Sequence, residues 1–313
     1  MPGLGLFRQA WWLDATAGAQ GWGEVRVEEN ARPVALLRFG VRKRLGFTLL
    51  QSPPLTPTLG PWFAPLVGKP AQVVAREKDL IGQLVAQLPP HDYFAQNLAP
   101  ATANWLPWHW LGFSQTTRYT YVLDLTQGEQ ALWEGCLPKL RTNVRKASSR
   151  FGLEVTSDLG IETFIAVQRS TFARQGLDVP MSDDLVRRLD AACEQRACRR
   201  MFFAVDAQRR VHAAAYLVWD ADRAYYLMAG RDSTLDNSGA GSLVLWEAIR
   251  FAIGVAPVFD FEGSMMEPVE HFVRTFGAVQ VPYHRISRTP SRLIGAARGL
   301  VDIRRALFGR RTS

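Results

Sequence analysis

The stretch RRMFFAVDAQRRVHAAAYLVWDADRAYYLMA, residues 199–229, decides the fold class. Apolar runs occupy 199–205, 211–219 and 223–229, and short polar segments separate them. Runs of this length, rich in Val, Phe and Tyr and bounded by turn residues, are typical of β-strands. The stretch therefore predicts three consecutive strands that form a β-meander.

The residues after the meander predict a loop, a helix and further alternating elements. The loop GRDSTLDNSGAG, residues 230–241, precedes a helix whose apolar residues recur at helical spacing until Gly254. A short apolar strand, a helix and a final strand are then predicted at 257–261, 268–276 and 279–286.

The first half of the chain repeats this order of predicted elements. We expect strands at 24–29, 33–41 and 46–51, a Pro-rich loop at 53–70, a helix at 73–88, a strand at 92–98, a helix at 101–111 and a strand at 116–125. Such a repeat of structural pattern indicates two related domains. An amphipathic helix, LPKLRTNVRKASSRF at 137–151, is expected to open the second.

The expected fold class is therefore α/β with mixed sheets, arranged as two tandem domains. We place the first domain at 1–130, the second at 131–288 and a basic C-terminal helix at 289–313. A length of 313 residues is sufficient for two domains that each bury a core.

Composition restricts the class of protein and its partners. Hydrophobic residues make up 47% and charged residues 21%, the proportions of a folded globular protein. No stretch predicts a signal peptide or a spanning helix, so a cytoplasmic location is expected. The three cysteines and five histidines show no metal-ligand spacing, so no metal is expected. The net charge of +8 favours anionic partners such as tRNA or an anionic membrane surface.

The segment Ser238, Gly239, Ala240, Gly241 and Ser242 stands at the predicted start of a helix after a strand and a loop. Glycines allow close approach, and the free amides and positive dipole end of the helix attract an anion, so this segment is a candidate pyrophosphate site. An ordinary flexible helix entry, capped by Asn237 or Ser238, explains the same residues.

Two carboxylates and a tyrosine are the candidate catalytic residues. Strand alternation in PVFDFEGS places Asp260 and Glu262 on one face, where mutual repulsion and burial can raise one pKa and create a general base. The alternative is that Glu262 caps the following turn and that Asp260 pairs with an arginine such as Arg231 or Arg274. Tyr226 is a candidate proton donor to a leaving thiolate, or a core residue.

Cations on the predicted helix at 137–151 are candidates for substrate binding. Lys139, Arg141 and Arg145 lie on its polar face, and Arg231 and Arg274 are further candidates outside it. A basic face of an amphipathic helix is otherwise simply solvated.

The second half resembles the Fem-like branch of the GNAT acyltransferase superfamily, most specifically at 139–147, 259–264 and 272–277. The first half, with PPLTPTLGPW, looks like the shortened N-terminal GNAT domain of the same tandem proteins. The resemblance implies direct transfer of an acyl or aminoacyl group to an amine. In acyl-CoA users of the superfamily, Tyr225, Leu227 and Ala229 would line pantetheine, while Ser238 to Ser242 would hold the pyrophosphate.

The peptidoglycan-bridge branch instead uses an aminoacyl-tRNA and carries a Lys after the Phe of an FKxxFG-like segment. This sequence has Val273 at that position, and no segment predicts the long helical hairpin of some Fem enzymes. We therefore expect an N-acyltransferase that uses acyl-CoA and acts on a small-molecule, sugar or peptide amine in cell-envelope or polysaccharide synthesis. The alternatives are a tRNA-dependent aminoacyl transferase and a non-catalytic binding module.

Overall fold

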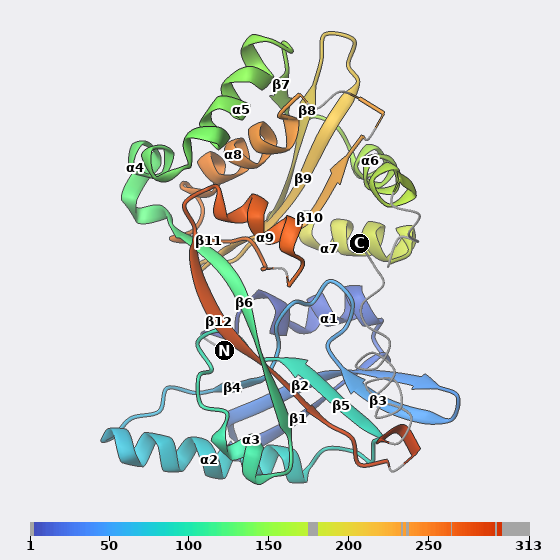
Figure 1. Cartoon of the computed structure of the whole chain (residues 1–313). Coiled ribbons are helices and arrows are strands. Elements are labelled where there is room, and N and C mark those ends of the chain that lie inside the picture. The colour runs from blue at the N-terminus through green and yellow to red at the C-terminus, as the bar shows by residue number, and fades with distance from the viewer. Residues whose placement is uncertain are drawn as a thin grey trace, which may run out of the picture. The chain divides into compact units, whose positions relative to one another are not determined.

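The structure is a computed structural model that describes residues 3–174, 181–232, 234–235, 238–263, 265–291 and 293–295. The chain divides into two compact units (Figure 1). Unit 1 comprises the residues up to Thr117 together with those from Tyr283 onward, and unit 2 comprises Arg118–Pro282. The division after Thr117 lies ahead of the predicted boundary at residue 130.

Unit 1 is a five-stranded sheet in the order β1-β2-β3-β5-β12, with β4 paired to β2 on the side. Its strands are β1 (Trp22–Glu29), β2 (Arg32–Arg44), β3 (Phe47–Gln51), β4 (Pro61–Phe63), β5 (Tyr93–Asn97) and the end of β12 (Val279–Arg288). Its helices are η1 (Leu6–Arg8), α1 (Ala10–Ala17), α2 (Pro70–Ala86) and α3 (Leu106–Trp110).

The core of unit 1 lies between the sheet and α2. Leu80, Ile81 and Leu84 recur at helical spacing and are fully buried against residues of β1 and β2 such as Val25 and Leu37. This apolar stripe explains why the segment folds as a helix on that face. Among the predicted helix residues of 101–111, Trp108 joins the core, whereas Trp110 is 61% exposed.

Unit 2 is a mixed sheet in the order β6-β11-β10-β9-β8-β7. Its strands are β6 (Ser114–Asp124), β7 (Glu154–Thr156), β8 (Arg199–Val205), β9 (Val211–Trp219), β10 (Ala224–Arg231) and β11 (Val258–Asp260). Its helices are η2 (Leu125–Gln127), α4 (Gly128–Gly135), α5 (Pro138–Ser149), α6 (Ile161–Arg174), α7 (Asp183–Glu194), α8 (Ala240–Ala252) and α9 (Glu267–Arg274).

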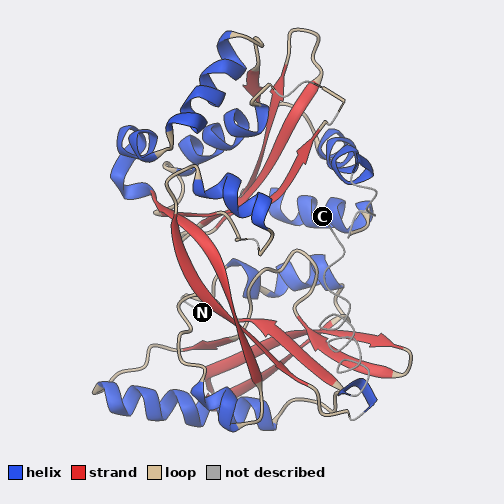
Figure 2. Cartoon of the chain, viewed as in Figure 1, coloured by secondary structure: helices blue, strands red, loops and turns tan. Residues whose placement is uncertain are grey.

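Helices cover both faces of the sheet in unit 2 (Figure 2). On one face α5 and α8 bury residues such as Val144 and Leu245 against Ala215 and Leu217 of β9. On the other face Phe164 of α6 packs edge-on against the fully buried Tyr216 of β9. Because both faces of this sheet are buried, the sequences of β8 and β9 are nearly continuous runs of apolar residues.

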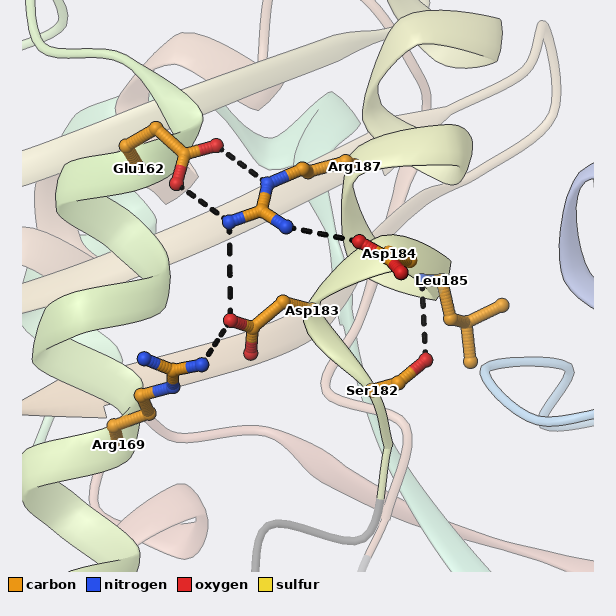
Figure 3. A network of polar contacts seen from close by, with 7 residues as sticks. All are labelled: Glu162, Arg169, Ser182, Asp183, Asp184, Leu185 and Arg187. Carbon is orange, nitrogen blue, oxygen red and sulfur yellow. Dashed lines mark hydrogen bonds and ion pairs between the residues drawn. The ribbon is translucent and has the colours of Figure 1, made fainter.

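A polar network at the surface joins α6 to α7 (Figure 3). Arg187 of α7 makes a bidentate ion pair with Glu162 of α6, with distances of 2.7 and 2.8 Å, and Arg169 pairs with Asp183. Ser182 caps α7 by accepting a hydrogen bond from the backbone N–H of Leu185. The network fixes α6 beside the sheet, where α6 contributes to the cavity described below.

The final strands of the two halves pair differently from the sequence prediction. β12, predicted to complete the second domain, pairs antiparallel with β5 at Arg285↔Asn97 through Arg288↔Phe94. β6, predicted to complete the first domain, pairs antiparallel with β11 at Val258↔Asp124 through Asp260↔Val122. Each unit thus receives one strand from the other half of the sequence, because hydrophobic pattern identifies a strand without naming its partner.

Several helices lie outside the sequence prediction, among them α1, α4, α6 and α7. The predicted basic helix at 289–313 falls mostly on 296–313, which lie outside the described residues. Within the described part of the chain, every helix is too short or too polar to cross a bilayer.

Candidate functional site

Strands β10 and β11 of unit 2 part almost as soon as they pair. They run parallel and meet only at Ala224↔Phe259 and Tyr225↔Asp260. Beyond Tyr225, β10 continues alongside β9 while β11 ends at Asp260. The parting leaves a wedge with β10 on one side and the residues after β11 on the other.

A β-bulge at Leu227 sets which side chains β10 presents. Register against β9 shifts between Tyr226 and Met228, so Leu227 is the extra residue. A bulge moves the alternation of side chains by one position. As a result Tyr226, Ala229 and Arg231 all line one cavity.

Helix α8 begins at the same cavity without a side-chain cap. Its N-cap is Gly239, which is left-handed at φ 82°, so the predicted capping by Ser238 is wrong and Asn237 lies outside the described residues. A Cβ at Gly239 would lie 2.5 Å from the backbone oxygen of Asn143 on α5. Only glycine fits this close approach, and the start of α8 has no side-chain cap, although the N–H of Ser242 donates to the Gly239 oxygen at 3.0 Å.

The cavity has a volume of about 350 Å³ and lies within unit 2. The elements β9, β10, α5, α6, α8 and α9 contribute its lining, with Asn143, Thr171, Ala213, Ala214, Tyr226, Ala229, Gly230, Arg231, Ser238, Gly239, Ala240, Gly241, Ser242, Val244 and Phe272. It therefore contains most of the residues predicted to bind a donor.

Ser238 at this helix start belongs to a buried polar chain. Its hydroxyl lies 3.3 Å from Nδ1 of His212, and Nε2 of His212 lies 3.2 Å from Oδ2 of Asp206. All three residues are at least nine-tenths buried. Arg210 also pairs with Asp206 at 2.7 Å.

Asp260 is held by neighbours on three sides. Its Oδ2 accepts a hydrogen bond from Arg223 at 2.6 Å, and its Oδ1 accepts from the hydroxyl of Thr120 and from the backbone N–H of Glu262 at 2.8 Å. The arginine that pairs with Asp260 is therefore Arg223, and not Arg231 or Arg274 as the sequence suggested. This fully bonded carboxylate is suited to positioning Glu262.

Glu262 lies just past β11, where the chain turns. Its φ of 57° is left-handed, so the alternation that predicted one face for both carboxylates ends before it. A Cβ at the next residue, Gly263, would lie 1.9 Å from the backbone oxygen of Tyr119, which pins the turn. Burial, with a smaller contribution from the charge of Asp260, raises the pKa of Glu262 well above its usual value. Its Oε1 is buried without a hydrogen-bond partner.

The two tyrosines of β10 are divided between the cavity and the carboxylates. Tyr226 lines the cavity, and burial raises the pKa of its hydroxyl, which stays protonated at neutral pH. Burial also raises the pKa of Tyr225, with further contributions from Asp220, Asp260 and Glu262. Tyr225 and the carboxylates are absent from the described lining residues of the cavity.

Most of the predicted cationic residues lie elsewhere on unit 2. Arg141 donates to the backbone oxygen of Glu134 at 3.0 Å, and Arg145 stacks 5.7 Å from the ring of Trp133. Lys139 is exposed on α5, and Arg274 pairs with Glu270 on α9. Of the predicted set only Arg231 lines the cavity. Its backbone is fixed by Thr171, whose hydroxyl donates to the Arg231 oxygen at 3.0 Å and accepts from the Arg231 N–H at 2.7 Å.

Sequence reasoning missed His212, Asp206, Asn143, Thr171 and Phe272. A signal existed for the first two, because they flank the predicted turn at 206–210 and a hairpin brings such residues together. The other three come from elements whose placement on the sheet no local pattern specifies. Among the described residues, no three His, Cys, Asp or Glu side chains gather as metal ligands would.

Comparison with known proteins shows what the segment around this site is similar to. Residues 137–267 match the family model described as the acetyltransferase (GNAT) domain. The matched segment contains β8, β9, β10, α8 and β11, and hence both carboxylates and every described lining residue of the cavity except Phe272. No curated protein matches the chain.

Solved structures extend the likeness to both units. A crystal structure of FemX aligns with a TM-score of 0.66 at 12% identity, covering 92% of each chain. A tandem GNAT protein from the clavulanic acid biosynthesis pathway aligns at 0.52 and 11% identity, covering 89% of this chain and 93% of that one. The C-terminal domain of a putative lysylphosphatidylglycerol synthetase from Agrobacterium fabrum aligns at 0.51 and 14% identity, covering 93% and 90%.

The predicted mixed α/β fold of tandem GNAT-like units is confirmed, and the predicted resemblance to the GNAT superfamily is supported by the family model that matches residues 137–267. The chain carries an acyltransferase-family domain in its second half, within the tandem fold that these structures share.

Proposed function

We propose that this protein is an N-acyltransferase that takes its acyl group from acyl-CoA. The observation that carries the proposal is the cavity where β10 parts from β11 and the uncapped start of α8 faces the lining of β10. Open amides at a helix N-terminus bind phosphate oxygens. A pyrophosphate held by Gly239 to Ser242 would direct pantetheine along Ala229 and Tyr226.

The reaction requires an amine, a base and a proton donor. The acceptor amine attacks the thioester carbon, its nitrogen loses a proton, and the C–S bond breaks to release the thiolate of CoA. We assign the amine proton to Glu262, whose unpartnered Oε1 and raised pKa suit a general base at neutral pH. We assign protonation of the thiolate to Tyr226, the protonated hydroxyl in the cavity.

The structure separates Glu262 from the lining of the cavity, so the proposal requires the acceptor to enter on the β11 side of the wedge. Asp260 holds the backbone of Glu262 and is itself neutralised by Arg223. Such a division leaves one carboxylate for positioning and one for proton transfer.

The proposed acceptor is a small-molecule, sugar or peptide amine of cell-envelope or polysaccharide synthesis. Fem-like and lysylphosphatidylglycerol synthetase-like neighbours support substrates that are linked to lipid or peptide, and tRNA and an anionic membrane surface as partners. The C-terminal basic residues of the sequence, including Arg304, Arg305, Arg310 and Arg311, are suited to such anions.

A second candidate is transfer of an aminoacyl group from tRNA. FemX as a structural neighbour favours it, whereas Val273 in place of the Fem-type Lys disfavours it. Acyl-CoA and aminoacyl-tRNA would use the start of α8 differently. Only acyl-CoA would place a pyrophosphate there.

A thermal-shift panel with CoA, acetyl-CoA and bulk tRNA distinguishes these functions. A ligand that binds only the folded state raises the free energy of unfolding, by about 2.7 kcal/mol at a hundredfold excess over Kd, and therefore raises the midpoint temperature. We expect stabilisation by CoA and acetyl-CoA and its loss in Gly241→Asp, which adds a negative side chain beside the open amides. Stabilisation by tRNA alone would support the aminoacyl donor, and stabilisation by neither would support a non-catalytic module.

A further inference from the structure

The chain Asp206–His212–Ser238 connects the donor cavity to a titratable ring. Ser238 lines the cavity and precedes the N-cap of α8, while His212 and Asp206 lie behind it in β9 and the turn before it. The contacts of 3.3 and 3.2 Å leave little room for rearrangement. An anion at α8 therefore meets the end of a buried proton-bearing chain.

The neutral ring has one arrangement consistent with its partners. The Asp206 carboxylate can only accept, so Nε2 of His212 carries the proton and donates to it. Nδ1 then lacks a proton and accepts from the Ser238 hydroxyl. In this state the hydroxyl proton points away from the cavity, and Ser238 cannot donate to a ligand.

Protonation of the ring reverses that bond. Imidazolium donates from both nitrogens, so Nδ1 donates to Ser238 Oγ and the hydroxyl proton becomes free to face the cavity. We propose that His212 takes up one proton when a diphosphate-bearing donor binds, and that this proton turns Ser238 into a donor to the bound anion. His212 and Asp206 are thus positioning residues for the donor, and the inference rests on the proposed acyl-CoA site.

Charged groups of both signs lie around His212. Asp206 faces Nε2, and Asp232 at the end of β10 is close enough to interact with the ring by charge, while its backbone N–H donates to the His212 oxygen at 3.1 Å. Arg210 neutralises part of Asp206, and Arg231 adds a cation at the cavity. From α6 the facing side chains are Ser170, which bonds Asp232, and the uncharged Thr171.

Asp206 stays ionised throughout. Burial alone would raise its pKa, but hydrogen bonds from the Arg210 backbone, His212 and the Arg210 side chain outweigh it and hold the pKa of Asp206 well below its usual value. The Asp206 carboxylate can therefore accept from Nε2 of His212 in both states of the ring.

Calorimetry of the full-length protein with 3′-dephospho-CoA tests the proposal. This probe keeps the diphosphate but lacks the phosphate monoester, whose own titration near neutral pH would otherwise add protons. Binding is measured at pH 7.5 in two buffers with different enthalpies of ionisation. We expect uptake approaching one proton per ligand, and a Kd that weakens as the pH rises, by up to about tenfold per pH unit.

The matched variants are His212→Asn and His109→Asn. His109 is exposed in unit 1, so its variant is expected to keep the uptake, whereas His212→Asn is expected to lose it. Asn retains a donor near the Nδ1 position but cannot titrate. The wild-type buffer comparison decides the proposal even if His212→Asn fails to fold.

The outcomes separate this inference from the proposed donor. Binding without uptake, or uptake that persists in His212→Asn, overturns the inference and leaves acyl-CoA as the donor. ADP-ribose, a diphosphate without pantetheine, is the second probe: uptake with ADP-ribose alone supports the His212 chain while removing CoA as the donor. Failure of both probes to bind overturns both proposals.

Discussion

The helix after the meander starts differently in the two units. In unit 1, α2 begins with Pro70, which has no N–H, and the backbone N–H of Lys69 before it donates to the Gln72 side chain at 3.0 Å. In unit 2, α8 begins after Gly239 with no side-chain cap, against a cavity. The start of this helix thus has a side-chain partner in unit 1, Gln72, and none in unit 2.

The strand that follows this helix shows the same contrast. In unit 1 the buried Gln96 of β5 uses both ends of its amide, donating to the Arg38 oxygen at 2.7 Å and accepting from the Gly60 N–H at 3.1 Å. In unit 2 Glu262 lies two residues beyond the end of β11, and its Oε1 is buried without a partner. Buried polar groups are normally satisfied, but unit 1 also has exceptions, among them Asn97 Oδ1 on β5, so this contrast concerns Gln96 and Glu262 alone.

This difference teaches that the fold alone does not make the site. Both units contain a meander, a helix and a following strand, yet in unit 2 this helix begins without a side-chain cap against a cavity, whereas in unit 1 Gln72 accepts from the N–H of Lys69 at the helix start. The predictions below test this contrast, beginning with the largest expected effect.

The largest effect is expected from separating the halves at the boundary that the sequence suggests. A fragment of residues 131–288 lacks β6, which pairs with β11 and bonds Phe261 and Asp260. We expect it to lack cooperative thermal unfolding, whereas a fragment of 114–288 keeps β6 and unfolds cooperatively. Circular dichroism of both fragments checks this. Equal cooperativity would show that the exchanged strand contributes little to unit 2.

The contrast between Glu262 and Gln96 predicts opposite effects on activity and stability. Glu262→Gln removes the proposed base and is expected to lower kcat by about 10²- to 10⁴-fold. Gln96→Leu leaves the Gly60 N–H and the Arg38 oxygen unpaired and is expected to cost about 1–3 kcal/mol of stability with normal turnover per folded molecule. Kinetics with an acyl-CoA and an amine acceptor, together with urea unfolding, measures both.

The pH dependence provides an independent check on Glu262. A base must be deprotonated, so kcat/KM is expected to rise with pH through a value well above 4.5 and to lose that rise in Glu262→Gln. Stability has the opposite sign: the folded state holds this proton more tightly than the unfolded state, so wild-type stability falls as pH rises past 4.5 relative to the variant. Full activity in Glu262→Gln would assign the base elsewhere.

The strands of the sheets could be predicted because the pattern of apolar residues along the sequence reflects which side chains are buried. The predicted strands 199–205 and 211–219 match β8 and β9, since both strands are buried and rich in apolar residues. Helix α6 has a weaker pattern, because its contacts are divided between the sheet and α7, and the sequence did not predict it.

The donor loop was also predictable, whereas its supporting residues were not. Ser238 to Ser242 carry a local signal, glycines at a helix start. Glu262 was selected by an alternation that the left-handed turn interrupts, so its proximity to Asp260 arises from that turn and not from a shared strand face. Arg223 carries no local signal for its partner Asp260, whereas His212 lies close to the predicted turn that contains its partner Asp206.

A smaller effect distinguishes the two glycines of the α8 start. Gly239→Ala places a Cβ against the Asn143 backbone at φ 82° and is expected to destabilise the protein by about 2–4 kcal/mol. Gly241 has open space around a Cβ and no left-handed φ, so Gly241→Ala is expected to change stability by at most about 1 kcal/mol, in the stabilising direction. Chemical unfolding of the two variants measures the difference. Equal destabilisation by the two substitutions would mean that the backbone of Asn143 lies farther from residue 239 than the close approach requires.

The smallest effect is expected at the start of α2, where opening the helix should not create a site. Pro70→Ala restores one N–H, but the Lys69 N–H still donates to Gln72, and none of the described residues near it repeats the wedge of β10 and β11. Loss of the restricted proline ring makes the unfolded chain more flexible, so stability should fall by about 0.4–1 kcal/mol. Calorimetric titration with 3′-dephospho-CoA should give the wild-type stoichiometry of one site per chain. A second binding event in Pro70→Ala would mean that a free amide is enough to bind the donor, and the contrast between the units would then reduce to this one proline.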